Sequence, residues 1–113
     1  MMESPSAVPD AQPLEPTQAH VEAFGALAHP SRLQIVALLA RERREMAVGE
    51  IHGALGIPAP TLSHHLDLLR RARLLRSRKE TRFVYYSVRP EMVTELARLL
   101  NACCDVSSTG PGA

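Results

Sequence analysis

Apolar residues recur at helical spacing through the first two thirds of the chain. The pattern predicts a first helix over residues 17–27 and a second that begins at Pro30, because proline suits the first turn of a helix. The run 33–39 is apolar nearly all round, which predicts a central and buried helix. A third, short helix over 48–55 is predicted to end at Gly56, since glycine favours helix ends.

A fourth helix follows a tight turn at residues 58–60, which holds two prolines. Its inner, apolar face is predicted to consist of Leu62, His65, Leu66 and Leu69. A rotation of about 100° per residue places a polar face on the opposite side, made of Pro60, His64, Asp67 and Arg71, with Thr61 and Ser63 on its flanks. The adjacent histidines are therefore expected to differ, with His64 facing outward and His65 packed inside.

The period of the pattern changes after the fourth helix. Residues 75–78 and 82–88 contain β-branched and aromatic residues on either side of 79–81, which predicts a two-stranded hairpin. Pro90 then begins a last helix, whose apolar face is Met92, Val93, Leu96, Leu99, Leu100 and Cys103. Two short helices joined by a tight turn and followed by a hairpin form a winged helix-turn-helix. The predicted fold is mainly α with a small β wing.

The fourth helix has the surface that a DNA-reading helix needs. Its outer face is small and polar, and it fits a major groove about 12 Å wide. The residues predicted to meet double-stranded DNA from this helix are Pro60, Thr61, Ser63, His64, Asp67, Arg70 and Arg71. Serine, histidine and aspartate occur together here, but on a groove-facing helix rather than in a pocket. We therefore expect no enzyme activity and no catalytic cofactor.

Charge is distributed unevenly, although the whole chain carries only +1. Residues 61–89 hold eight bases and two acids, a local charge of +6, whereas residues 1–22 carry −4. Phosphate contacts require such a local positive field. Arg78, Lys79 and Arg82 lie near the predicted hairpin tip, where they suit phosphates or a minor groove. The alternative is a solvated arginine face on an ordinary small helical bundle.

Composition sets the expected domain boundaries. The chain has 113 residues, 45% hydrophobic and 22% charged, which suits one folded domain. Residues 1–16 contain four of the nine prolines, three acids and no base, so they are predicted to be a disordered acidic leader. Residues 106–113 are predicted to be a flexible tail, which leaves 17–105 for the winged domain. A core of this size is marginal alone, and that favours a dimer.

No pattern in the sequence points to a membrane or to secretion. The apolar run 35–40 is too short to span a bilayer. The start of the chain lacks the basic and apolar regions of a signal peptide. We therefore expect a cytoplasmic protein without a membrane partner, in which the adjacent Cys103 and Cys104 remain free thiols.

Three segments together resemble the ArsR/SmtB family of metal(loid)-responsive bacterial repressors. Residues 26–33, Ala-Leu-Ala-His-Pro-Ser-Arg-Leu, are similar to the family's entry signature, 61–70 to its recognition helix and 83–86 to its wing. The match covers about residues 17–104. The resemblance implies a homodimer whose first and last helices form the interface. It also implies an inverted-repeat operator that is bound without inducer and released with it.

Two positions depart from the family pattern. This chain has Arg73 after the recognition helix and Thr81 at the wing tip, where the family usually or often has glycine. A residue other than glycine in the left-handed conformation costs roughly 1 kcal/mol. We expect altered local geometry at both positions with the fold retained, and Arg73 offsets the cost if it adds a phosphate contact.

The resemblance also implies where a sensor would lie. One class of members places cysteines at the start of the third helix, where this chain has Ala47, Gly49 and His52. Another class binds zinc through Asp, His and Glu on the last helix, but residues 91–105 hold no histidine. His52 is either a stray metal ligand or an ordinary packed histidine. Neither of the family's two sites is therefore expected.

Cys103 and Cys104 are the remaining sensor candidates. In one interpretation they are a small apolar pair that packs at the end of an interface helix. In the other they bind a soft thiophilic centre such as trivalent arsenic or antimony, because the chain resembles arsenical sensors with cysteines near the end of the last helix. Two alternatives are a redox switch through a disulfide across the dimer and Zn²⁺ or Cd²⁺ held by four sulfurs from two chains.

The positions of the two thiols set conditions on the inducer. Neighbouring residues on a helix point about 100° apart, so binding of both sulfurs to one centre requires residues 101–105 to fray or unwind. That change would tilt one protomer against the other and disturb the spacing of the recognition helices, which must match half-sites about 34 Å apart. Arsenite takes a third ligand, whereas an organic form such as methylarsenite needs only two sulfurs.

Overall fold

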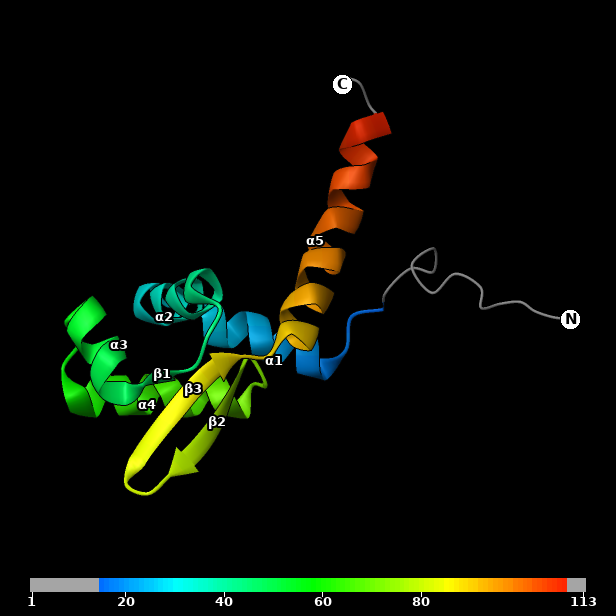
Figure 1. The fold of residues 1–113 in the computed structure, drawn as a ribbon. Helices are drawn as coiled ribbons and strands as arrows, with labels where there is room; N and C mark the ends of the chain where they lie inside the picture. The colour runs from blue at the N-terminus through cyan, green and yellow to red at the C-terminus, as the bar shows by residue number, and fades with distance from the viewer. Residues whose placement is uncertain (1–14, 110–113) are drawn as a thin grey trace, which may run out of the picture.

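The computed structural model describes residues 15–109, and the side chains of residues 15–103. Its helices are α1 (Gln18–Leu27), α2 (Pro30–Glu42), α3 (Val48–Leu55), α4 (Ala59–Arg71) and α5 (Pro90–Thr109), and its strands are β1 (Met46–Ala47), β2 (Leu75–Glu80) and β3 (Phe83–Val88) (Figure 1). The order of the helices and of the hairpin confirms the predicted winged helix-turn-helix. Proline begins both α2 and α5, as the sequence predicted.

The wing is a three-stranded antiparallel sheet with the order β1-β3-β2, so the prediction of only two strands was wrong. β2 and β3 pair along their whole length. The additional strand consists of Met46 and Ala47, which pair with Tyr86 and Tyr85. Two residues are too few to show a period of two in the sequence. The pairing with β3 is what makes this segment a strand.

The core lies where α2, α3, α4 and the base of the wing meet. Its fully buried large side chains are Ile35, Leu39, Ile51, Leu62, Leu66, Leu69, Leu74 and Leu75. α2 is less central than its apolar sequence predicted, because Leu33 is 54% exposed and Ala37 is exposed as well. One face of α2 fills the core, and the other face lies on the surface of the chain.

The turn between α3 and α4 positions the helix that faces outward. Gly56 ends α3 with φ +70°, a conformation that favours glycine. The His52 ring bonds the Ile57 carbonyl through Nδ1 at 2.7 Å, which ties α3 to this turn. α4 begins at Ala59, so Pro60 lies inside the first helical turn rather than in the connecting turn.

α5 is the longest helix and continues past the end predicted for it. The helix runs without a break through residues 101–105 to Thr109, four residues into the segment that was predicted to be a tail. Figure 1 shows its first half against α1 and its second half extending beyond the other elements. Residues 1–14 and 110–113 lie outside the described residues, and with them most of the predicted leader and the end of the tail.

Three residues other than glycine have a positive φ: Arg43 at 57°, Arg73 at 66° and Thr81 at 56°. Arg73 and Thr81 are the two positions where the family pattern has glycine. Both adopt the left-handed conformation that glycine favours, so the altered local geometry that we expected is not seen. The chain keeps the backbone shape and bears the conformational cost.

No single helix in the described part of the chain is long and apolar enough to cross a membrane. α1 and α2 meet the requirements of length and composition only as a pair, with a bend of 100° between them. Their apolar residues Ala23, Ile35 and Leu39 belong to the core.

Candidate DNA-binding surface and sensor segment

The outer face of α4 is accessible along the length of the helix. Most of the side chains predicted to meet DNA are exposed, and Asp67 is half-buried: Pro60, Thr61, Ser63, His64, Asp67, Arg70 and Arg71. The apolar stripe on the opposite side of the helix is buried, which anchors the outer face to the core. Because hydroxyl and imidazole groups occupy the first two turns, this half of α4 offers hydrogen bonds to base edges.

The C-terminal half of α4 carries a cluster of charges that neutralise one another in part. The Asp67 carboxylate accepts a bond from Arg70 at 2.7 Å and pairs with Arg71 at 2.9 Å. These bonds hold the pKa of Asp67 below its usual range, chiefly through the hydrogen bond from Arg70. Asp67 therefore positions both guanidinium groups at the edge of the outer face.

Arg78 does not lie free at the wing tip. Its guanidinium donates two bonds to Glu45 at 2.8 and 2.9 Å and one to Glu80 at 2.8 Å, and it lies 4.8 Å from the centre of the Tyr85 ring. The bond from Arg78 lowers the pKa of Glu45, and the two carboxylates raise the pKa of Arg78. Arg78 thus links β2 to the segment before β1. Tyr86, the other tyrosine of β3, packs against the core.

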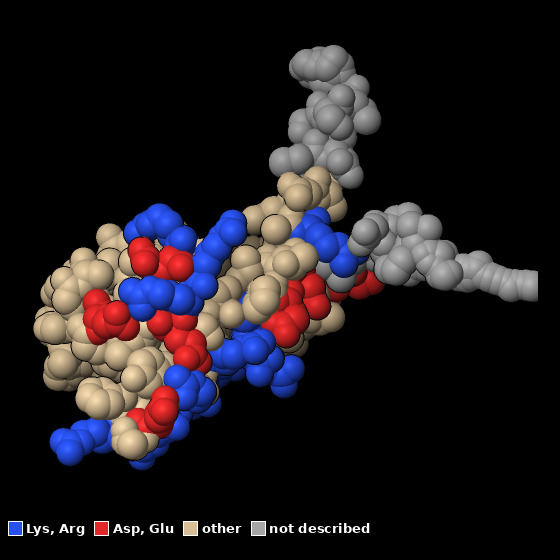
Figure 2. Space-filling model, viewed as in Figure 1, with Lys and Arg blue, Asp and Glu red and all other residues tan. Residues whose placement is uncertain are grey.

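The cations that remain accessible on the wing are Lys79 and Arg82. Among the described residues, neither has a hydrogen-bond or ion-pair partner. Figure 2 shows lysine and arginine side chains along the lower edge of the molecule, where the hairpin lies in Figure 1, while acids and bases alternate above it. β2 packs against α4. The structure therefore brings the outer face of α4 and the free wing cations to the same region.

The two adjacent histidines of α4 differ as the sequence predicted. His64 is exposed, whereas His65 is only 5% exposed, and its Nδ1 has no partner within the described part of the chain. The His65 ring lies 4.7 Å from the ring of His29, and Arg32 is close by. Burial lowers the pKa of His65, and the neighbouring cationic groups lower it further. His29 carried no recognisable signal in the sequence.

His20 joins α1 to α5, which the sequence did not reveal either. The ring is 4% exposed and accepts a bond from the Thr17 amide at Nδ1, 3.0 Å, while Nε2 lies 2.6 Å from the Glu95 carboxylate. Because Nδ1 is an acceptor in this arrangement, Nε2 carries the proton and donates it to Glu95. Only a contact across 75 residues identifies this histidine as the link between the first and last helices.

The sensor candidates lie on the extended half of α5. Cys103 is exposed, and its thiol donates a long bond of 3.7 Å to the Leu99 carbonyl. The side chain of Cys104 lies outside the described residues. At the other family position, His52 is exposed but bonds a carbonyl of the α3–α4 turn. No group of three or more metal-binding side chains occurs in the part of the chain that the structure describes.

Comparison with known proteins agrees with this arrangement. A helix-turn-helix domain family matches residues 27–78. The regulator KmtR of Mycobacterium tuberculosis is 38% identical over 104 residues, which are 92% of this chain and 77% of KmtR. The arsenical resistance operon repressor of Escherichia coli is 36% identical over 72% of this chain and 68% of its own length.

A solved structure adds information on the assembly of a related protein. It is the homodimeric winged helix-turn-helix DNA-binding domain of a possible ArsR-family regulator from Mycobacterium bovis, with 31% identity and a TM-score of 0.63. The match covers 79% of this chain and 81% of that one. With the fold, the surface of α4 and these relatives in agreement, the chain belongs to the ArsR/SmtB family of winged helix-turn-helix transcriptional regulators.

Proposed function

We propose that this protein is a homodimeric repressor that releases its operator when a trivalent arsenic compound binds to α5. The outer face of α4 carries the DNA-binding part of this proposal, because Thr61, Ser63 and His64 are exposed on a helix whose other side is locked into the core. Residues near the start of a recognition helix contact base edges in the major groove. The unpaired Lys79 and Arg82 lie on the adjoining wing and supply phosphate contacts.

Exposed apolar side chains on α1 and α5 support the homodimer. Val21 and Leu100 are each 57% exposed, and the second half of α5 extends beyond the other elements (Figure 1). A second copy that packs against this helix removes these side chains from water, at about 25 cal/mol for each Å² of apolar surface. The homodimeric relative from Mycobacterium bovis supports the same assembly. Such a dimer presents the outer face of α4 twice, which suits an inverted-repeat operator.

Cys103 supports a thiol-based sensor on the interface helix. Its thiol is exposed, and only one weak bond to a carbonyl engages it. Cys104 follows it in the sequence, so each protomer supplies two sulfurs, the ligands that soft thiophilic centres prefer. The 36% identity with an arsenical resistance operon repressor favours trivalent arsenic among such centres.

The continuous helix through residues 103 and 104 defines the mechanism of release. The two side chains leave an intact helix about 100° apart, so one arsenic atom binds both sulfurs only after this part of α5 unwinds locally. Unwinding changes the helix that we place at the dimer interface, and the two copies of α4 then lose the separation that the half-sites require. Methylarsenite needs two sulfurs and is the preferred inducer, whereas arsenite recruits a third ligand.

Base contacts from α4 are tested with an operator selected by the protein from a random duplex library. We expect Ser63→Ala combined with His64→Ala to weaken binding to this operator at least tenfold, because a good set of base contacts contributes about 1–3 kcal/mol. Binding to unrelated DNA should change little. The exposed Gln34 of α2 offers a control, and Gln34→Ala should bind like the unchanged chain. Equal operator affinity of the double variant would refute the assignment.

The identity of the inducer is tested on the same complex by fluorescence anisotropy. The ligands are methylarsenite, arsenite, antimonite, Zn²⁺, Cd²⁺ and peroxide. We expect methylarsenite, and arsenite more weakly, to lower operator affinity by about 5- to 150-fold, the usual range of allosteric coupling. Release by Zn²⁺ or Cd²⁺ alone would indicate a metal sensor instead, and release by peroxide alone would indicate a redox switch.

A further inference from the structure

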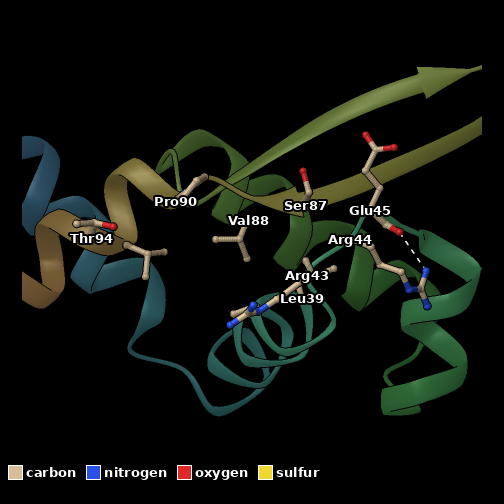
Figure 3. A pocket seen from close by; sticks show the side chains of 10 residues that line it. Leu39, Arg43, Arg44, Glu45, Ser87, Val88, Pro90 and Thr94 are labelled. Carbon is tan, nitrogen blue, oxygen red and sulfur yellow. Dashed lines mark hydrogen bonds between the residues drawn. The ribbon is translucent and has the colours of Figure 1, made fainter.

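A cavity of about 510 Å³ lies where the end of α2, the end of β3 and the start of α5 meet (Figure 3). Its apolar lining comes from three elements: Leu39 of α2, Val88 of β3, and Pro90 and Val93 of α5. Leu39 is buried, while Val88 and Val93 are half-buried. The volume is within the range of small-molecule sites in proteins, about 300–1,000 Å³. None of the residues assigned to DNA or to arsenic lines this cavity.

Two of the three charged side chains around the cavity already have partners. Arg44 bonds Glu50 at 3.2 Å and the backbone carbonyl of Glu45, and the Glu45 carboxylate is held by Arg78. In Figure 3 the Arg44 side chain points away from Val88 and Pro90, and the Glu45 carboxylate also points outward. Their charges are therefore balanced outside the cavity.

Arg43 is the remaining charge, and it faces the cavity. Its guanidinium has no hydrogen-bond or ion-pair partner within the described part of the chain. The backbone at Arg43 is held in place, because its amide bonds the Leu39 carbonyl at 3.0 Å and its φ is 57°. In Figure 3 the side chain runs along the end of α2 toward the α5 side, below Val88. An apolar cavity with one uncompensated cation at its wall is complementary to an apolar anion.

We propose that this cavity binds a small apolar monocarboxylate, with the carboxylate paired to Arg43 and the hydrocarbon part against Leu39, Val88 and Val93. A guanidinium binds a carboxylate through two parallel hydrogen bonds, which a neutral or cationic ligand cannot accept in the same way. The hydroxyl of Thr94 adds a polar group to the lining. The ligand would touch the base of the wing and the start of α5 at once. This proposal is independent of the arsenic site, because it involves neither cysteine.

Binding is measured by calorimetry on the full chain without DNA, with decanoate as the probe. Decan-1-ol and decylamine provide the same hydrocarbon with a neutral and a cationic head. We expect one decanoate per protomer and at least tenfold weaker binding of the alcohol and the amine, since a charge-assisted bidentate pair is among the strong hydrogen-bonded contacts. Failure of decanoate to bind at millimolar concentration would overturn the proposal, as would equal binding of the amine.

Two variants locate the bound probe. Arg43→Gln should weaken decanoate about tenfold and leave decan-1-ol unchanged, whereas Arg41→Gln, at an exposed arginine that does not line the cavity, should change neither. Thr94→Trp places a large side chain at an exposed lining position without altering the core, so both probes should lose affinity. Circular dichroism establishes that the variants fold. Decanoate binding that is unaffected by both Arg43→Gln and Thr94→Trp would exclude this cavity as the site.

Discussion

His64 and His65 are adjacent on α4 but have opposite environments. His64 is exposed on the face assigned to DNA, and His65 is buried against His29 with an unpartnered ring nitrogen. Rotation along the helix predicted which histidine packs inside. It did not predict the partner, because His29 lies in the turn before α2 and only the tertiary fold brings it to α4. The contact links the start of α2 to the back of the recognition helix.

Burial of His65 predicts that acid destabilises the protein before its carboxylates titrate. The folded chain holds the pKa of His65 below its usual value, so the ring stays neutral there, while the unfolded chain binds a proton near pH 6.5. Stability is therefore complete above pH 6.5 and is lost as the pH falls below it. We expect His65→Gln to flatten the fall in unfolding free energy between pH 7 and pH 5, measured with urea, and His64→Gln to leave it intact. An unchanged slope in His65→Gln would contradict this account.

Thr81 at the wing tip adopts a conformation that favours glycine. We expect Thr81→Gly to stabilise the protein by about 0.5 kcal/mol, because the relief of roughly 1 kcal/mol of strain is offset in part by the greater freedom of glycine in the unfolded chain. The neighbouring Arg82→Gly is the control and should be destabilising, since Arg82 has no positive φ. Urea unfolding at one fixed protein concentration compares them. A Thr81→Gly variant less stable than Arg82→Gly would show that the tip is unstrained.

At the scale of elements, the wing divides its cations between two roles. Arg78 is held by Glu45 and Glu80, whereas Lys79 and Arg82 are unpaired among the described residues. All three were predicted to meet DNA because they lie near the hairpin tip. The pairing of Arg78 with Glu45 spans 33 residues and depends on β1, a strand too short to recognise from the sequence. Proximity to the tip could be predicted, but the ion pairs could not.

The division of roles predicts different salt dependences of operator binding. The slope of log affinity against log salt concentration decreases in magnitude by about 0.9 for each phosphate contact that is lost. We expect Lys79→Gln combined with Arg82→Gln to reduce the slope by about this amount per contact in each protomer. Arg78→Gln should reduce it less, because its charge is already balanced by two carboxylates. A larger reduction from Arg78→Gln than from the double variant would show that Arg78 leaves its carboxylates to bind DNA.

The helices show how far hydrophobic periodicity determines this fold. The starts of α1, α2 and α5 agree with the capping threonine and the prolines in the sequence. The end of α5 was predicted too early, because the serine-rich composition after residue 105 suggested a tail. The position of the α4 face could be predicted because it depends only on helical rotation. The His20–Glu95 link could not, since α1 and α5 are far apart along the chain.

At the scale of the whole molecule, the proposed dimer explains why apolar side chains remain outside the core. Leu100 on α5 should pack against the second copy, so Leu100→Glu should give the mass of one chain in sedimentation experiments where the unchanged protein gives the mass of two. Phe83 on the wing is similarly exposed at 55%, and Phe83→Glu should keep the dimer mass. An intact Leu100→Glu dimer would place the interface elsewhere.

The central claim is that arsenic releases the operator through Cys103 and Cys104. The most direct measurement is the anisotropy of the selected operator in complex with the protein, titrated with methylarsenite. The unchanged chain should release the operator, whereas the variant with both Cys103→Ser and Cys104→Ser should bind it with the same initial affinity and retain it throughout the titration. Release that persists in the double serine variant would contradict the account.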